Sequence, residues 1–324
     1  MIGKYRVDWH AGMRLTDESF RSADEYYLSC LQPLYSVLSK GDYGFLDTPV
    51  FRYEATESDL SVIEFKAEAI CRSGKLISLS FNREERQLFQ NIILPQTSEP
   101  LIVYIDKTSE GTVKVPSDNP SVPLCDADYK IIARPESEYY SNPDAVPFAR
   151  LVFCGGWTMD SSFIAPCVLL RANGSVLSSA SGFVTGLELI IRNLTEVRDT
   201  AGRAIAMSAL PALVMISTEL QKEADSMSPR HFITLMQKSI RVLVTLADTD
   251  TSVIVPEKER CTSFIESYYT PYKISPMINE GLYLIRALAS LSDSFIPGPE
   301  PMTPDLPRQL RRAAATDSIR KKHH

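Results

Sequence analysis

Apolar and polar residues alternate along several segments between Tyr43 and Leu170, which is the pattern of half-buried β-strands. The apolar positions expected to face inward in two of these segments are Ile63, Phe65, Ala67 and Ala69, then Ile77, Leu79 and Phe81. Pro, Gly, Asp and Ser residues separate the segments, and no helical pattern long enough for a parallel crossover lies between them. The alternation therefore predicts an antiparallel β-sandwich.

The period of the apolar residues lengthens to about 3.5 near Gly182, which indicates helices. The first helical stripe has heptad spacing and contains Phe183, Leu187, Ile190, Leu194 and Val197. Two interpretations of this stripe are open. It can form the core of a bundle within one chain, or it can contribute to a threefold seam between chains.

Further helical segments follow the first one. Pro211 begins or bends a segment that carries Leu213, Ile216 and Leu220. Ser228 is placed to cap the next helix, and Pro229 occupies its first turn, where a missing N–H costs nothing. The buried face of that helix is expected to include Phe232, Leu235, Leu243 and Leu246. A last helix begins near Pro276 and carries Ile278, Leu282 and Ile285. Helices in series of this kind predict a helical bundle.

The predicted fold class is thus α+β, with an antiparallel β-sandwich followed by an α-helical bundle and a short basic tail. Residues 1–178 are expected to hold an N-terminal arm, a helix and the sandwich. Residues 179–292 are expected to form the bundle, and residues 293–324 a tail whose composition is that of a disordered segment.

The chain opens with a short alternating segment, Tyr5 to Trp9, which predicts a strand. Gly12 then allows a turn, and Thr16 or Asp17 is placed to cap a helix. The apolar residues of this opening are Trp9, Met13, Leu15 and Phe20. Trp9 and Phe20 can be core residues, but an aromatic arm ahead of the sandwich is also suited to packing across a subunit boundary.

Composition is that of a soluble globular protein, with 44% apolar and 23% charged residues among 324. A formal net charge of -6 argues against a general nucleic-acid binder. The first residues lack the apolar core of a secretory signal, and the longest apolar run is far short of the roughly 20 residues of a membrane span. A cytoplasmic protein is expected.

Residues that could carry catalysis or bind a metal do not form a recognisable pattern. The six cysteines are scattered without a close pair, which fits neither a zinc site nor a disulfide framework. His10 and His231 are the internal histidines, and no acid or cysteine stands at a recognisable spacing from either of them. A P-loop and the common dinucleotide and zinc-protease motifs are missing from the sequence. We therefore expect no enzyme activity, no cofactor and no metal.

The end of the chain, from about Ser292, is rich in proline and then basic. Two interpretations are open for it, a solvated terminus or a docking tail for an acidic partner or a membrane surface. The basic residues that would dock are Arg308, Arg311, Arg312, Lys321 and Lys322.

Four segments, in order along the chain, resemble TssK, the baseplate adaptor family of bacterial type VI secretion systems. At the opening the matching residues are Trp9, Gly12, Met13, Leu15, Phe20 and Asp24, although Asp17, Glu18 and Ser19 replace the Pro-Gln-His part of the family motif. The other three matches are VPFARL from Val146, FIAPC from Phe163 and SPRHFITLM from Ser228. They fall where the apolar pattern places a strand, a domain junction and the start of a helix.

The resemblance implies a homotrimer and a structural role in a contractile injection machine. It implies a sandwich like the shoulder domain of siphophage receptor-binding proteins, and a helical neck. The neck and sandwich would bind the baseplate wedge subunits TssF, TssG and TssE. Family members also have a folded C-terminal head that contacts the membrane complex, whereas here only the tail follows the last helix.

Docking to a membrane-anchor complex would therefore fall to the tail. The assembled protein is expected in the cytoplasm, at the inner face of the inner membrane. The alternative function is a phage or phage-like tail protein that binds a receptor or serves as an adaptor.

Overall fold

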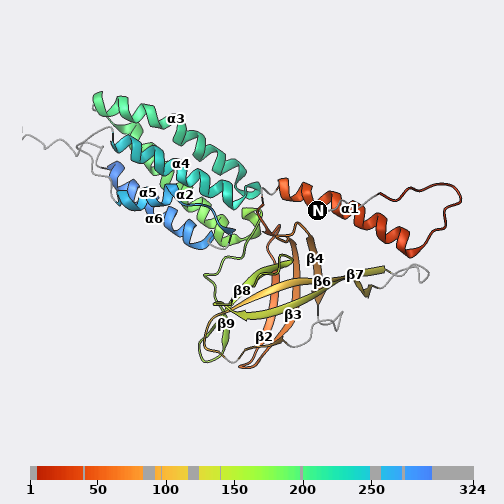
Figure 1. Cartoon of the computed structure of the whole chain (residues 1–324). Helices are drawn as coiled ribbons and strands as arrows, with labels where there is room; N and C mark the ends of the chain where they lie inside the picture. Colours follow the sequence, from red (N-terminus) through yellow and green to blue (C-terminus); the bar gives the residue numbers. More distant parts are fainter. Residues whose placement is uncertain are drawn as a thin grey trace, which may run out of the picture.

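A computed structural model describes residues 6–38, 41–82, 92–95, 97–115, 124–138, 140–197, 200–248, 257–271 and 274–293. These residues form an antiparallel β-sandwich, a bundle of helices beside it, and an N-terminal helix that lies outside both (Figure 1). The predicted α+β fold class is confirmed.

Two antiparallel sheets make up the sandwich. In the first sheet β3 (Asp59–Ile70) pairs with β1 (Gly44–Phe45), β2 (Val50–Ala55), β4 (Leu76–Asn82) and β5 (Ile92–Ile93). The second sheet has the order β7 (Leu124–Pro135), β6 (Leu101–Val115), β8 (Ala145–Phe153) and β9 (Trp157–Met159). All of these pairings are antiparallel, as the strands without crossover helices predicted.

The inner faces of the two sheets meet in one apolar core. Phe51 and Phe65 of the first sheet contact Phe148 of the second edge to face, with ring centroids 4.8 and 4.9 Å from Phe148. The indole of Trp157 donates a hydrogen bond to the Glu57 carbonyl across the sandwich, at 3.1 Å. These contacts join strands far apart in the sequence into one domain.

The inward positions of β3 differ in part from the predicted ones. Phe65, Ala67 and Ala69 are buried as expected, but Ile63 is only half-buried. The register between β2 and β3 shifts at this point, so that Arg52 lies opposite Glu64 and the next residue lies opposite Val62. Ile63 is therefore the extra residue of a β-bulge and has no partner on β2. The bulge changes which alternate residues of β3 face the core.

The bundle contains α2 (Gly174–Glu196), α3 (Thr200–Glu223), α4 (Pro229–Asp248), α5 (Lys258–Glu266) and α6 (Ile274–Asp293). Short 3₁₀ turns, η1 (Leu170–Ala172) and η2 (Ala224–Ser226), lie at the end nearer the sandwich. Asn173 caps α2, because its side chain accepts hydrogen bonds from the Ser175 and Val176 amides. The expected domain boundary at residues 178 and 179 thus falls inside α2, and α5 is a helix that the apolar pattern did not predict.

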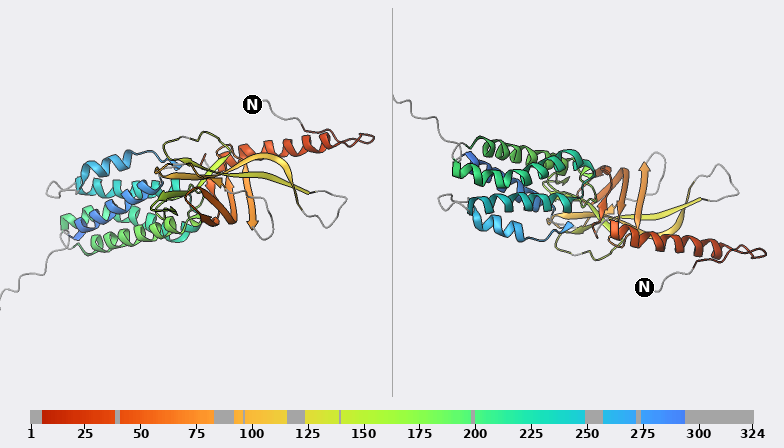
Figure 2. Two further views of the ribbon diagram at one scale, coloured as in Figure 1. Left: turned by 90° about the horizontal axis from the view of Figure 1, so that it is seen from below. Right: turned by 90° about the horizontal axis from the view of Figure 1, so that it is seen from above.

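Helices α2 and α6 run in the same direction and lie close together (Figure 2). A Cβ added at Gly182 would meet Leu282 at 3.8 Å, and one at Gly186 would meet Ile285 at 3.3 Å. Among the described residues, α2 is the one helix long and apolar enough to cross a membrane. Its apolar face is packed inside the bundle, which is the usual place of such a helix in a folded core.

The N-terminal helix α1 (Asp17–Leu38) begins as predicted, since the Thr16 hydroxyl accepts a hydrogen bond from the Ser19 amide at 3.2 Å. Gly12, with φ of +84°, makes the expected turn. The predicted strand ahead of it does not form. Residues 6–10 have no regular secondary structure, and Tyr5 lies outside the described residues. A strand needs a neighbouring strand to satisfy its backbone hydrogen bonds, and none of the strands in the described part of the chain pairs with residues 6–10.

Candidate interaction surfaces

Helix α1 carries a row of exposed apolar side chains. Phe20, Tyr27 and Leu34 are 52%, 56% and 51% exposed, and they stand seven residues apart, which places them on one face. None of the described side chains of α1, from Asp17 to Tyr35, is buried. Figure 1 shows this helix lying along the outside of the sandwich, joined to the body at its C-terminal end. A helix of this composition is stabilised by packing of its apolar face, so the row is a candidate interaction surface.

The four candidate residues at the N-terminus lie close to this row. The rings of Trp9 and Phe20 are in contact, with centroids 5.6 Å apart, and Trp9 is 41% exposed. Leu15 is exposed and Met13 is half-buried. The structure thus brings Trp9 and Phe20 together, and it places neither of them in the core. We call Trp9, Phe20, Tyr27, Leu28, Leu31 and Leu34 the arm surface.

The heptad stripe of α2 occupies the core of the bundle. Phe183, Leu187 and Ile190 have no exposed surface, and Leu194 and Val197 are 3% and 4% exposed. Phe183 packs edge to face on Phe232 of α4, with ring centroids 6.1 Å apart. Side chains buried within one chain have no surface left for a second chain. The interpretation of this stripe as a subunit seam is therefore corrected, and the stripe belongs to the intramolecular core.

The sandwich and the bundle are joined by an ion pair whose carboxylate is buried and whose arginine is partly exposed. Arg230, at the start of α4, donates to Asp42, just before β1, from Nη2 at 2.7 Å and from Nε at 3.0 Å. The Asp42 side chain is 1% exposed. The Arg230 guanidinium also lies over the ring of Tyr269, 4.9 Å from its centroid, and the hydrogen bonds to Asp42 raise the pKa of Arg230. Two residues 188 positions apart thereby fix the bundle to the sandwich.

Backbone contacts reinforce the same junction. The Phe45 amide donates to the Pro166 carbonyl at 2.9 Å, and the Leu170 amide donates to the Met227 carbonyl at 2.9 Å. On the outside, Arg171 pairs with Asp47 at 3.0 Å, with both side chains at least half exposed. The segment from Phe163 to Cys167 thus lies between the sandwich and the bundle, where the sequence predicted a domain junction, and hydrogen bonds tie this part of the chain to both.

Two ionisable groups at the junction are strongly shielded from water. Burial, with a smaller contribution from the Asp42 carboxylate, raises the pKa of Cys167 to about 12. Burial first, and then Asp42, also raises the pKa of Tyr269. Both groups are therefore neutral in the folded protein at neutral pH.

The Cys167 thiol gives the junction a pH dependence that can be measured. In the unfolded chain this thiol loses its proton near pH 8.5 to 9, whereas in the folded protein it keeps the proton up to about pH 12. Between these values the unfolded state binds fewer protons, so the free energy of unfolding falls by about 1.4 kcal/mol per pH unit from this group. The contribution is fully present below pH 8.5.

Urea denaturation at a series of pH values tests this. The Cys167→Ala variant is expected to lose stability less steeply than the wild type between about pH 9 and pH 11. The pKa of Tyr269 is raised mainly by burial in both proteins, so the difference between them reports chiefly the thiol. Parallel curves for the two proteins would contradict the prediction.

The polar residues considered for catalysis make local contacts. The ring of His231 pairs with Glu219, which links α4 to α3, and His10 bonds to the Asp8 carbonyl. Within the described part of the chain, no three His, Cys, Asp or Glu side chains gather as metal ligands. Of the cysteines with described side chains, Cys30 and Cys154 are exposed, and Cys71, Cys167 and Cys261 are buried. These arrangements support the fold and define no reaction centre.

The basic residues of the predicted docking tail, from Arg308 to Lys322, lie outside the described residues. Their role stays a prediction.

The described residues form an outer helix, an antiparallel sandwich and a helical bundle joined to it. Solved structures with a similar fold include TssK structures and a type VI secretion baseplate complex. One chain of a TssK-TssF-TssG baseplate subcomplex matches with a TM-score of 0.64 and 16% identity, covering 89% of this chain and 99% of that one. The crystal structure of TssK matches with a TM-score of 0.64 and 13% identity, covering 89% of this chain and 69% of that one.

TssK of the EAEC type VI system, in complex with a nanobody, matches with a TM-score of 0.57 and 14% identity over 83% of this chain and 68% of that one. The resemblance predicted from four short segments is thus confirmed at the level of the fold. No protein-family model matches the chain, and no curated protein matches it.

Proposed function

We propose that this chain is a structural subunit of a type VI secretion baseplate, a trimeric adaptor between the baseplate wedge and the cell envelope. The observation that carries the proposal is the match to one chain of a TssK-TssF-TssG subcomplex over 89% of this chain and 99% of that one. A fold shared over nearly the full length of both chains keeps the sandwich, the neck and their relative placement. Those are the parts through which an adaptor would hold its partners.

The arm surface supports the assembly part of the proposal. Its rings and aliphatic side chains are exposed on a helix that has no buried side chain among those described. Lasting interfaces bury an apolar surface of this kind. We assign the arm surface to a neighbouring copy in a homotrimer, and the remaining outer surface of the sandwich and neck to TssF, TssG and TssE.

Light scattering on a sizing column tests both parts. The wild-type chain, of 36.2 kDa, is expected to elute with three times that mass, and to move to a larger complex when mixed with the wedge subunits. The double variant Tyr27→Asp with Leu34→Asp is expected to elute as a monomer, because two carboxylates cannot be buried in an apolar interface without a partner.

The matched control is Ser22→Asp, an exposed position on the opposite face of α1, which is expected to stay trimeric. A wild-type chain that is monomeric and does not bind the wedge subunits would overturn the proposal. A trimer that survives the double variant would remove only the assignment of the arm surface.

The envelope side of the proposal rests on the sequence of the tail. A net positive segment after Asp293 suits an acidic partner at the inner face of the inner membrane. We propose this segment as the membrane-complex contact of the assembled, cytoplasmic adaptor.

A further inference from the structure

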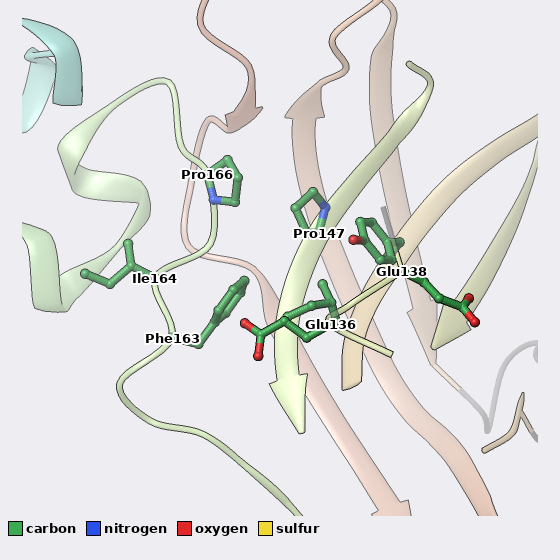
Figure 3. Close-up of a pocket in the computed structure, with 8 residues that line it drawn as sticks. Glu136, Glu138, Pro147, Phe163, Ile164 and Pro166 are labelled. Carbon is green, nitrogen blue, oxygen red and sulfur yellow. The ribbon is translucent and has the colours of Figure 1, made fainter. Parts of the chain in front are cut away.

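A small pocket lies on the outer face of the second sheet, next to the junction with the bundle (Figure 3). Its floor is formed by Ile102 and Tyr104 of β6 and Pro147 of β8, and all three are buried. The segment between β9 and η1 closes one side with Phe163, Ile164 and Pro166. The cavity volume is about 230 Å³. Pockets for cofactors and drug-sized ligands usually measure about 300–1,000 Å³. This pocket is therefore sized for a few side chains of a peptide.

The walls of the pocket have the chemistry that binds proline-rich peptides. Two aromatic rings, Tyr104 and Phe163, stand beside two proline rings, Pro147 and Pro166. Aromatic-lined grooves bind a polyproline II helix because that conformation is already formed before binding and costs little entropy. No side chain of α1 or of the bundle lines this pocket among those described.

Acidic groups dominate the open edge of the pocket. Glu136 and Glu138 line it directly, in the turn after β7. Glu136 pairs with Arg150 at 2.7 Å, and Glu138 pairs with Arg134 at 3.5 Å. Arg150 also pairs with Asp160, so three carboxylates share two guanidinium groups. A fourth carboxylate, Glu99, accepts a hydrogen bond from the Ser137 amide and pairs with neither arginine in these contacts. The edge therefore keeps an excess of negative charge, which attracts a basic ligand.

The chain itself contains a segment with the complementary pattern, outside the described residues. Pro301, Pro304 and Pro307 stand three residues apart, and Arg308 follows. A polyproline II helix has three residues per turn, so these prolines would share one edge. Three arginines lie between Pro307 and Ala313, which provides the positive charge.

The length of this segment allows it to reach the pocket. Helix α6 ends at Asp293, at the end of the bundle away from the sandwich (Figure 1). Helix α6 has 20 residues and is therefore about 30 Å long, so a return along the bundle must cover at least this length. The chain from Asp293 to Pro307 spans about 43 Å in the polyproline II conformation, at roughly 3.1 Å per residue. It can therefore return along the bundle and place Pro304 and Pro307 at the pocket.

We propose that residues 301–308 of the same chain bind in this pocket, with the prolines between Tyr104 and Phe163 and Arg308 at the carboxylates of Glu136 and Glu138. The inference does not depend on the proposed baseplate function. It assigns residues 301–308 a site on the body of their own chain, and it leaves the basic residues from Arg311 to Lys322 for the envelope contact proposed above.

Photo-crosslinking of the full chain tests the assignment. The photoreactive residue p-benzoylphenylalanine replaces Leu306, between the two prolines, and cross-linked peptides are mapped by mass spectrometry. Products are expected with the peptides that contain Tyr104, Pro147 or Phe163. The same residue placed at Ala315, beyond the proposed contact, is the control and is expected to give none of these products.

Two variants separate the contributions of the prolines and of the charge. Pro304→Ala with Pro307→Ala, and separately Glu138→Lys, are expected to remove most of the pocket product. Glu196→Lys, an exposed carboxylate at the far end of α2, is the matched control for the charge reversal and is expected to leave the yield unchanged. Mixing light and heavy isotope-labelled copies is expected to give products within one copy. Products on another surface, or between copies only, would overturn the assignment.

Discussion

Replacing Arg230 with alanine is expected to lower the free energy of unfolding by about 3 kcal/mol. The Asp42 carboxylate is 1% exposed and loses the guanidinium that neutralises it. Removing one partner of a buried ion pair is costly because the remaining charge is held in a region of low dielectric constant. Urea denaturation at a fixed protein concentration measures the change, since the stability of an oligomer depends on concentration.

Arg171→Ala is the matched control, because Arg171 forms an ion pair with Asp47 at the same junction but in contact with water. Exposed pairs contribute about 0–1 kcal/mol, so this variant is expected to change little. Arg230→Lys is expected to lie between the two, because a lysine keeps the charge and loses the paired hydrogen bonds. Equal losses for Arg230→Ala and Arg171→Ala would contradict the role assigned to the buried pair.

Replacing Gly44 with alanine is expected to lower the free energy of unfolding by about 4 kcal/mol or more. Single substitutions have so large an effect only when they disrupt the core or strain the backbone severely. Gly44 has φ of +123°, a conformation that residues with a side chain rarely adopt. An added Cβ would stand 2.0 Å from the carbonyl oxygen of Pro166, which is a backbone atom and cannot turn aside. The clash would break the hydrogen bond from the Phe45 amide to that same carbonyl.

Gly155→Ala separates the clash from the backbone strain. Gly155 also has a positive φ, of +74°, but nothing lies within 4 Å of the added Cβ. Gly155→Ala is expected to lower the free energy of unfolding by about 1–2 kcal/mol, because alanine must adopt the left-handed conformation there. Circular dichroism followed during urea denaturation measures both. Similar midpoints for the two variants would show that the junction between β1 and Pro166 can open without cost.

Local sequence patterns predicted several helix starts and buried helix faces correctly. The helix starts at Thr16 and at Ser228 were predicted from capping residues, and both caps form, the second through a bond from the His231 amide to the Ser228 hydroxyl. The stripe from Phe183 was recognised as one helix face, because apolar spacing depends only on the geometry of the helix itself. Helix α5 was missed, since Cys261 and Phe264 are its only buried residues and do not make a periodic stripe.

Contacts between distant residues could not be predicted in the same way. Nothing near Asp42 in the sequence indicates Arg230, and nothing near Gly44 indicates the carbonyl of Pro166. The apolar pocket residues come from two strands and a loop, so they become neighbours only when the sheet forms. The sequence left Trp9 and Phe20 open between the core and a subunit boundary, because an apolar helix face has the same pattern whether the chain covers it or leaves it exposed.

The sequence by itself determined that a sandwich of strands precedes a bundle of helices, and it determined the buried faces of α2, α3 and α4 and the resemblance to TssK. These depend on residues within a few turns of one another. Only the tertiary structure decided that the α2 stripe is intramolecular and that α1 is uncovered. It also decided that a bulge at Ile63 changes the inward positions of β3. Each of these depends on which surfaces meet across the chain, and a periodic pattern records that a face is apolar without recording what packs against it.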